Sequence, residues 1–287
     1  MGFAAVPEKS YNNLTPTMIN QHLTSGQSDG KLTSEDANTP SATSVAEPDY
    51  NERFETRANS LRNLYQNLSA IEDYYYLSDS DFQTEAERRK WEDWRRSVNI
   101  SEVHDSKANV LSERLRLAQD TERLKIINPN FDTGLEAYTN NCQRCVVAQE
   151  INARGHRVRA KAYDASDPIG NNGIAVWNLS TTPWSRDPFV KLTNKDDFWD
   201  DAKQAFAEWG DGARAIVRVE WNNGRGHFFS AERVGNTIVY TDLQSATVRD
   251  ILDTLSLCTG KSNRLWLMRV DNRDLNNLAQ YAVEAIS

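Results

Sequence analysis

The sequence lacks the features that mark several large classes of protein. Its three cysteines, Cys142, Cys145 and Cys258, are too few, and odd in number, for a disulfide framework. No apolar run approaches the length of about eighteen residues that a membrane-spanning helix needs, so we expect no membrane span. The N-terminus shows no charged region followed by a long apolar one, so no secretory signal peptide is visible.

A block of basic residues is also missing. Acidic residues number 41 against 33 basic ones, which leaves a net charge of -8. A nucleic-acid-binding protein normally presents a broad basic footprint to the phosphates. We therefore expect no nucleic-acid partner.

Large apolar residues are scarce at the start of the chain. Residues 1–50 hold only three aromatic residues and no tryptophan, whereas all eight tryptophans lie from Trp91 to Trp266. Ser, Thr, Asn, Gln, Gly and Pro dominate these first fifty residues, and such a segment cannot bury enough apolar surface to fold alone. We expect residues 1–50 to form a disordered or partner-ordered arm.

Residues 51–130 are predicted to form a helical docking or linker segment. Apolar residues such as Leu61, Leu64 and Leu68 recur at the spacings of one helical face. No cluster of titratable groups there suggests chemistry. The Asn-Pro-Asn sequence at 128–130 interrupts the pattern, and we place a domain boundary next to it.

Residues 131–287 are predicted to form one α+β domain. Residues 141–153 predict a helix with apolar side chains on nearly every side, which should therefore be buried. Later runs predict an antiparallel sheet with a hairpin that turns at Gly235-Asn236. A buried helix followed by such a sheet defines the α+β class. The expected strands cover 158–162, 213–220, 227–234, 237–242 and 265–270, and the expected later helices cover 196–209, 247–257 and 275–286.

An Asn followed by a Cys at the start of the first of these helices suggests a nucleophile. Asn is favourable at an N-cap, so Asn141 would place Cys142 in the first helical turn. Unpaired backbone N–H groups and the helix dipole stabilise negative charge there. The thiolate is the nucleophilic form of Cys, and the same N–H groups can bind an oxyanion.

Two later residues could complete a Cys–His pair. His227 follows a Gly-x-Gly sequence at the head of an expected strand, where glycines let a substrate approach closely. Asp242 lies near the end of the paired strand, and the hairpin can bring it near His227. A carboxylate that holds a His in one tautomer is the orienter that a Cys–His pair needs. The chain order of Cys142, His227 and Asp242 is the layout of papain-like folds.

The spacing of Cys142 and Cys145 also admits two other functions. A structural zinc site would need two more ligands, from Cys258, His156 or His227, and the chain has no second closely spaced pair. A thioredoxin-type dithiol also lies at a helix start, but that fold leads a strand straight into the motif. The residues before Cys142 do not form a convincing strand. We therefore expect neither a metal nor a cofactor.

Five stretches of the chain follow the pattern of a known family: NCQRCVVA at 141–148, RGHRVRA at 154–160, ARAIVRVEW at 213–221, GHFFSAE at 226–232 and DLQS at 242–245. Together they resemble the papain-fold toxin family of protein-glutamine deamidases. That family occurs at the C-termini of bacterial polymorphic toxins and in some phage minor capsid proteins. The resemblance covers about residues 135–271. The family often has Pro where this chain has Leu243, which changes a turn and not a catalytic group.

The resemblance implies that the chain hydrolyses the side-chain amide of a glutamine on a target protein. Cys142 would be the nucleophile, His227 the general base and acid, and Asp242 the orienter of His227. Cys142 is preferred over Cys145, because Cys145 lies one turn deeper in the helix and would pack. Cys258 has no expected role beyond burial. The implied partners are the substrate protein and an immunity protein.

Three amide side chains are candidates for positioning the substrate or the oxyanion. Asn140 or Asn141 would help the backbone N–H groups near Cys142 to hold the oxyanion. Gln244 would position His227 or the substrate, although a turn role fits it equally well.

Two other functions stay open from the sequence. A cysteine protease or transglutaminase of the same fold shares the acyl-enzyme step and differs in acyl donor and acceptor. Alternatively, the chain is a virion-associated or structural docking protein that attaches through residues 1–130 and carries the domain as cargo. Without a visible signal peptide, we expect synthesis in a bacterial cytoplasm, followed by delivery as an effector or with a virion.

Overall fold

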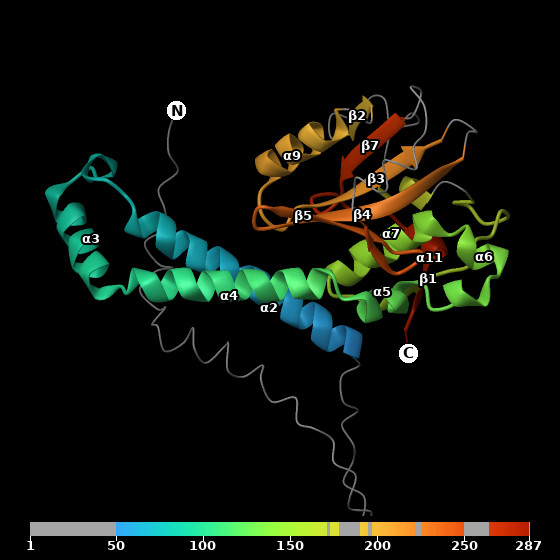
Figure 1. The fold of residues 1–287 in the computed structure, drawn as a ribbon, viewed down its shortest axis with the longest axis horizontal. Helices are drawn as coiled ribbons and strands as arrows, with labels where there is room; N and C mark the ends of the chain where they lie inside the picture. Colours follow the sequence, from blue (N-terminus) through green and yellow to red (C-terminus); the bar gives the residue numbers. More distant parts are fainter. Residues whose placement is uncertain are drawn as a thin grey trace, which may run out of the picture. The chain divides into compact units, whose positions relative to one another are not determined.

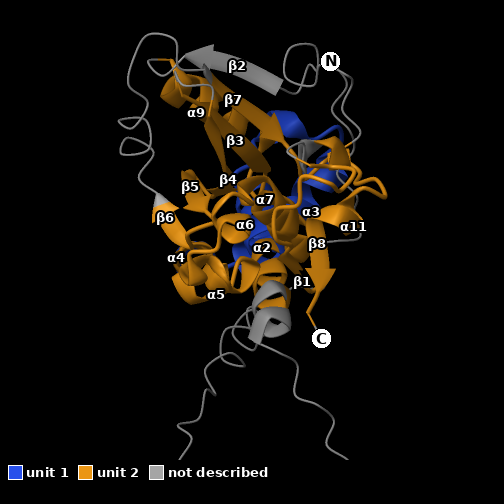
Figure 2. Cartoon of the chain, turned by 90° about the vertical axis from the view of Figure 1, so that its right-hand side faces the viewer, with its two compact units in different colours: residues 1–47, 63–110 blue, residues 48–62, 111–287 orange. Residues whose placement is uncertain are grey.

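A computed structural model describes residues 50–170, 173–177, 190–194, 197–221, 225–249 and 264–286. These residues gather into two compact units (Figure 2). Unit 1 contains residues 63–110, and unit 2 contains residues 50–62 and the described residues from 111 onward. The predicted arm, apart from Tyr50, lies outside the described residues, as do Gly224 and Cys258. The predicted domain boundaries stay a prediction.

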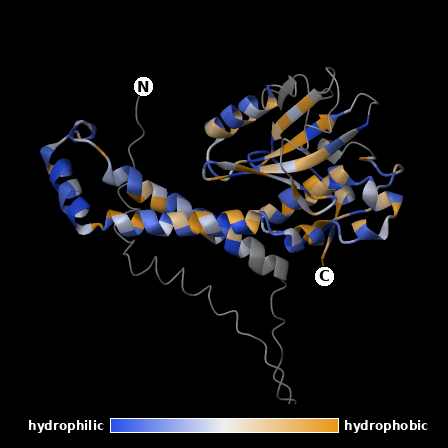
Figure 3. Cartoon of the chain, viewed as in Figure 1, coloured by the Kyte–Doolittle hydropathy of each residue, from blue (hydrophilic) through white to orange (hydrophobic). Residues whose placement is uncertain are grey.

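Unit 1 is helical and has few buried apolar residues. The Thr84 side chain accepts from the N–H of Glu87 at 3.2 Å and the Glu87 carboxylate accepts from the N–H of Thr84 at 3.0 Å, which is a capping box. The buried Trp91 donates its indole N–H to the carbonyl of Tyr74 at 2.8 Å. Figure 3 shows α3 as almost entirely hydrophilic, as expected of a solvated helix. The unit contains parts of α2 (Tyr50–Tyr75) and α4 (Ile100–Ala118), with η1 (Asp79–Asp81) and α3 (Glu85–Ser97) between them.

Unit 2 contains a six-stranded antiparallel sheet in the order β2-β7-β3-β4-β5-β6 and a two-stranded ladder of β1 and β8. No helix in the described ranges is both long and apolar enough to cross a membrane. The strands are β1 (Val158–Ala160), β2 (Val190–Asn194), β3 (Arg214–Glu220), β4 (Gly226–Val234), β5 (Thr237–Asp242), β6 (Thr247–Arg249), β7 (Arg264–Arg269) and β8 (Val283–Ala285). The helices are α5 (Thr121–Ile127), η2 (Phe131–Thr133), α6 (Glu136–Thr139), α7 (Cys142–Ala153), η3 (Gly173–Trp177), α9 (Phe198–Trp209) and α11 (Ala279–Ala282).

Alternation along the strands sends side chains into two cores, one on each face of the sheet. Ile216, Phe228 and Met268 belong to the core that contains α7, whereas Val217 and Phe229 belong to the core under α9. Figure 1 accordingly shows α7 and α9 on opposite faces of the sheet. The combination of helices with an antiparallel sheet confirms the predicted α+β class.

The hairpin between β4 and β5 turns at Gly235-Asn236, as predicted. Gly235 has a φ of 61°, in the left-handed region that glycine adopts without strain. The turn sets the register of the two strands. Extended to the strand ends, this register places Asp242 opposite Phe229, diagonally across from His227 on the same side of the strand pair.

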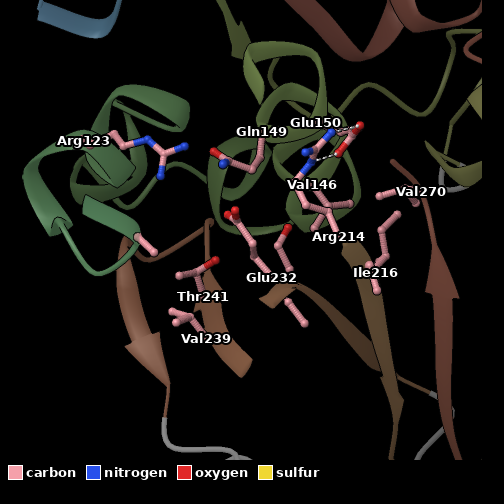
Figure 4. Close-up of a pocket in the computed structure, with 14 residues that line it drawn as sticks. Arg123, Val146, Gln149, Glu150, Arg214, Ile216, Glu232, Val239, Thr241 and Val270 are labelled. Carbon is pink, nitrogen blue, oxygen red and sulfur yellow. Dashed lines mark hydrogen bonds and ion pairs between the residues drawn. The ribbon is translucent and has the colours of Figure 1, made fainter. Parts of the chain in front are cut away.

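Helix α7 is buried on nearly every side, as its sequence predicts. Its Glu150 carboxylate pairs with Arg214 of β3 and with Arg154, each at 2.8 Å, and Figure 4 shows Arg214 reaching Glu150. The pair therefore ties the helix to the centre of the sheet. A cavity of about 20 Å³ beside it is lined in part by Gln149 and Thr241. It has room for about one water molecule, which is too little for a substrate side chain.

Two helices predicted from the sequence contain strands in the described part of the structure. The helix predicted over 247–257 starts instead with β6, which pairs with β5, and residues 250–257 lie outside the described residues. The helix predicted over 275–286 shrinks to the single turn α11, because the next three residues pair with the free edge of β1 as β8. At β8, pairing with a strand that is distant in sequence overrides local helical spacing.

Candidate active site

The two thiols of α7 lie in different surroundings. Cys142 is the first residue of the helix and is partly exposed, whereas Cys145 is fully buried. The Cys145 thiol donates to Oδ1 of Asn141 at 3.4 Å. Burial raises the pKa of Cys145 well above its usual range, and the nearby Cys142 and Asp242 add to this effect. A buried thiol of this kind is a poor nucleophile, so the arrangement favours Cys142 as the reactive one.

His227 lies at the start of β4, where Gly226 brings this strand close to β3. A Cβ atom at position 226 would lie 2.5 Å from the carbonyl oxygen of Val219, so a larger residue would push the strands apart. We expected this glycine to make room for a substrate, and in the structure the neighbouring strand fills that space. The close contact holds the backbone that carries the His227 ring, which stays 19% exposed.

The carboxylate of Asp242 is held by the turn that follows β5. Its Oδ1 atom accepts from the backbone N–H groups of Gln244 at 3.1 Å and Ser245 at 3.4 Å, which is the pattern of an Asx turn. Leu243, where the family often has Pro, is fully buried in the core beside α7. The turn thereby directs Oδ2 of Asp242 toward His227.

The structure brings Cys142, His227 and Asp242 together. Nε2 of His227 lies 2.9 Å from Oδ2 of Asp242, which is an ion-pair distance. The two atoms are not aligned well enough for a hydrogen bond. The Cys142 thiol lies near the same imidazole and raises its pKa.

The His227 imidazole is strongly basic. Burial lowers its pKa, but the interactions with Asp242 and with Cys142 together outweigh burial and raise the pKa to about 10. The ring therefore carries a positive charge at neutral pH, between a carboxylate and a sulfur atom.

Asn141 and Gln244 join Asn128 in a buried group, which we call the amide cluster. Asn128 and Asn141 exchange two hydrogen bonds, each from Nδ2 to Oδ1, at 3.2 and 3.1 Å. Gln244 donates from Nε2 to Oδ1 of Asn141 at 3.3 Å. Asn140 is not part of the cluster, because it is exposed and donates to Glu136 at 3.3 Å.

Asn141 occupies the N-cap position of α7, but its side chain does not cap the helix. Its backbone carbonyl accepts from the N–H groups of Arg144 at 2.8 Å and Cys145 at 3.1 Å. Its side chain instead bonds within the amide cluster and donates to the carbonyl of Lys161 at 3.2 Å. The side-chain cap expected from the sequence is therefore absent, because buried amide partners compete for the same groups.

Two residues that support the site could not be identified from the sequence. In the sequence Asn128 belongs to the Asn-Pro-Asn turn signal. No local pattern distinguishes an asparagine that will be buried from one that lies in an exposed turn. Arg144, only 2% exposed, pairs with Asp167 at 2.7 Å and donates to the carbonyl of Tyr281. Its contacts hold two distant segments against the first turn of α7, and they became visible only in the folded chain.

No metal site is evident in the part of the chain that the structure describes, where no three His, Cys, Asp or Glu residues gather as ligands would. A larger cavity, of about 270 Å³, lies beside Gln244, and neither Cys142 nor His227 lines it. It is therefore adjacent to the Cys–His pair and separate from it. Its lining comes from α5, η2 and the turn after β5: Lys125, Ile126, Asn128, Pro129, Phe131, Asp132, Gln244, Ser245 and Ala246.

Comparison with known proteins gives one match. Residues 140–247 match the family model described as papain fold toxin 1, glutamine deamidase. The matched segment lies within unit 2 and contains Cys142, His227 and Asp242. No curated protein and no solved structure matches the chain significantly. Residues 140–247 are thus similar to the papain fold toxin 1, glutamine deamidase family.

Proposed function

We propose that this protein hydrolyses the side-chain amide of a glutamine on a target protein. In the proposed reaction Cys142 is the nucleophile, His227 the general base and acid, and Asp242 the residue that orients His227. One observation carries the proposal: a partly exposed thiol lies near an imidazole that is 2.9 Å from a buried carboxylate. The family match, which names glutamine deamidases, supports this reaction class.

The proposed reaction passes through a thioester. His227, held by Asp242, lies beside the proposed nucleophile as the second member of a Cys–His pair. The Cys142 thiolate attacks the carboxamide carbon, and His227 donates a proton to the amide nitrogen as ammonia departs. His227 then removes a proton from a water molecule, which attacks the thioester and releases glutamate and the thiol.

The start of α7 is suited to the negative charge that forms during both attacks. Cys142 lies in the first turn, where backbone N–H groups and the helix dipole stabilise an oxyanion. Because Asn141 and Gln244 bond to each other, we assign them to positioning the protein's own groups. Asn140, which is exposed, is the amide suited to contact with a substrate protein.

The test compares substitutions of two cysteines in α7, one partly exposed at the first residue of the helix and one buried a turn later. The wild type, Cys142→Ala and Cys145→Ala would each be incubated with a panel of bacterial proteins. The readouts are released ammonia and the mass change that accompanies conversion of glutamine to glutamate. We expect Cys142→Ala to lose activity, on the order of 10⁴-fold or more, and Cys145→Ala to keep its chemistry with some loss of stability.

Other outcomes would contradict specific parts of the proposal. Full activity in Cys142→Ala together with loss in Cys145→Ala would show that the nucleophile is misassigned. Cleavage of the peptide bond without ammonia release would identify a cysteine protease. Ammonia release together with attachment of an added amine would identify a transglutaminase.

A further inference from the structure

The Asn128 side chain makes four hydrogen-bonding contacts within and around the amide cluster. Its Nδ2 group lies within hydrogen-bonding distance of the Tyr138 carbonyl at 3.0 Å, Asn141 Oδ1 at 3.2 Å and the Gln244 carbonyl at 3.0 Å. Its Oδ1 atom accepts from Asn141 at 3.1 Å. The side chain is only 4% exposed, and its two N–H bonds are shared among three acceptors.

The residues that Asn128 contacts are the direct supports of the two halves of the candidate site. Asn141 directly precedes Cys142 at the start of α7. The backbone of Gln244 contacts Asn128 through its carbonyl and holds the Asp242 carboxylate through its N–H. One buried amide therefore joins the support of the nucleophile to the support of the carboxylate that faces His227.

The hydrogen bonds of Asn128 resist distortion, because breaking them leaves buried polar groups without partners. A buried amide or carbonyl that loses its partner destabilises the fold, because its lost hydration is no longer offset by a hydrogen bond. Replacing Asn128 removes a partner from three buried groups at once. A displacement of about 1 Å in an active site can lower a rate by about 10²-fold, so small movements at this point have large effects.

We propose that Asn128 is a positioning residue that sets the distance between Cys142 and His227. It lies outside the matched segment 140–247, so a residue before this domain segment would complete its catalytic geometry. The inference rests on the proposed function in that it takes the Cys–His pair as the reacting groups. It does not depend on which amide or peptide the pair attacks.

The test measures the reactivity of Cys142 directly and needs no protein substrate. The full chain would be treated with iodoacetamide over a range of pH, and alkylation would be followed by peptide mass after trypsin digestion. Trypsin cuts after Arg144 and so places Cys142 and Cys145 in different peptides. The variants are Asn128→Ala and, as a matched control, Asn130→Ala, whose side chain makes no cap hydrogen bond at the start of η2.

We expect Asn128→Ala to slow alkylation of Cys142 on the order of tenfold at neutral pH, which is the effect of losing about 1.4 kcal/mol. The pH profile should move upward, because the thiol and the imidazolium would no longer be held together. Asn130→Ala should match the wild type. A purely structural role for Asn128 would lower the thermal midpoint and leave the rate and pH profile of the folded protein unchanged.

Two results would overturn the proposal: a wild-type alkylation profile in folded Asn128→Ala, or an equal change in Asn130→Ala. If Asn128→Ala does not fold, Asn128→Ser takes its place, because a hydroxyl keeps one of the hydrogen bonds. Its profile should then lie between wild type and the profile of Asp242→Ala, and a wild-type profile would again overturn the proposal. Failure of the glutamine assay alone would contradict the proposed function and not this inference.

Discussion

At the scale of single residues, the charge on His227 is the property with the widest consequences. An imidazole with a pKa of about 10 binds a proton more tightly in the folded chain than in the unfolded one, where the ordinary value is 6.5. Its contribution to the free energy of unfolding is therefore fully present below about pH 6.5 and is lost as the pH rises through about 10. The same charge keeps the ring ready to protonate a leaving group.

Asp242→Asn should remove much of this pH-dependent stability. The substitution keeps an oxygen that can accept from the N–H of Gln244 but removes the charge that faces His227. We expect the stability gap between wild type and variant to be largest below about pH 6.5 and to narrow toward pH 10. Urea unfolding at a series of pH values measures this gap. A gap that stayed constant from pH 6 to 10 would show that His227 is not stabilised by Asp242.

At the scale of elements, the buried helix α7 depends on an ion pair as well as on apolar packing. Glu150 is 3% exposed in its side chain and pairs with Arg214, which alternates to the α7 face of β3. Burial makes such a pair a weak source of net stability, but removing one partner leaves an uncompensated charge. The position of the helix start, and so of Cys142, therefore depends on a contact two turns away.

Glu150→Ala should destabilise the protein by about 3–5 kcal/mol, because it leaves Arg214 and Arg154 without their carboxylate. The control is Glu284→Ala, which breaks the exposed pair with Arg159 and should cost less than about 1 kcal/mol. Chemical unfolding of the three proteins compares these losses. Equal losses in both variants would contradict a special role for the buried pair.

At the scale of the whole molecule, the residues needed for the candidate chemistry are all in unit 2. This unit also includes the first part of α2, where Arg57 pairs with Glu113 at 2.9 Å and Arg62 with Glu232 at 3.1 Å. The polar composition of residues 1–50 suits attachment to a partner better than catalysis. We propose that these residues serve delivery or assembly of an effector or a virion-associated protein.

Two nested deletions separate these roles. Removing residues 1–47 should leave alkylation of Cys142 and amide hydrolysis unchanged in vitro and abolish delivery or assembly in a cellular assay. Removing residues 1–62 also deletes Arg57 and Arg62, and should lower stability by about 1 kcal/mol or less for each lost ion pair. If the shorter deletion already abolished catalysis, the arm would be part of the enzyme, and the delivery proposal would fail.

The elements that could be predicted from the sequence are those whose pattern is local. The apolar residues of α7 and the Gly235-Asn236 turn each carry their own signal, and both appear in the structure. Strand β6 pairs with the neighbouring strand β5, and the helical spacing of residues 247–257 predicted a helix in its place. Strand β8 could not be predicted locally, because its partner β1 lies far away in the chain. Asn128 was missed for the same reason, since its hydrogen bonds reach residues 13 and 116 positions away.

The sequence by itself determined the α+β class, the family resemblance and the three residues of the Cys–His–Asp arrangement, because residue type and order carry that information. Only the tertiary structure decided how these residues are held. In the folded chain Cys145 is buried and Cys142 is partly exposed. The Asn141 side chain, which the sequence predicts to cap the helix, belongs instead to the amide cluster. Burial and long-range hydrogen bonds arise only when distant segments pack together, so no local pattern in the chain encodes them.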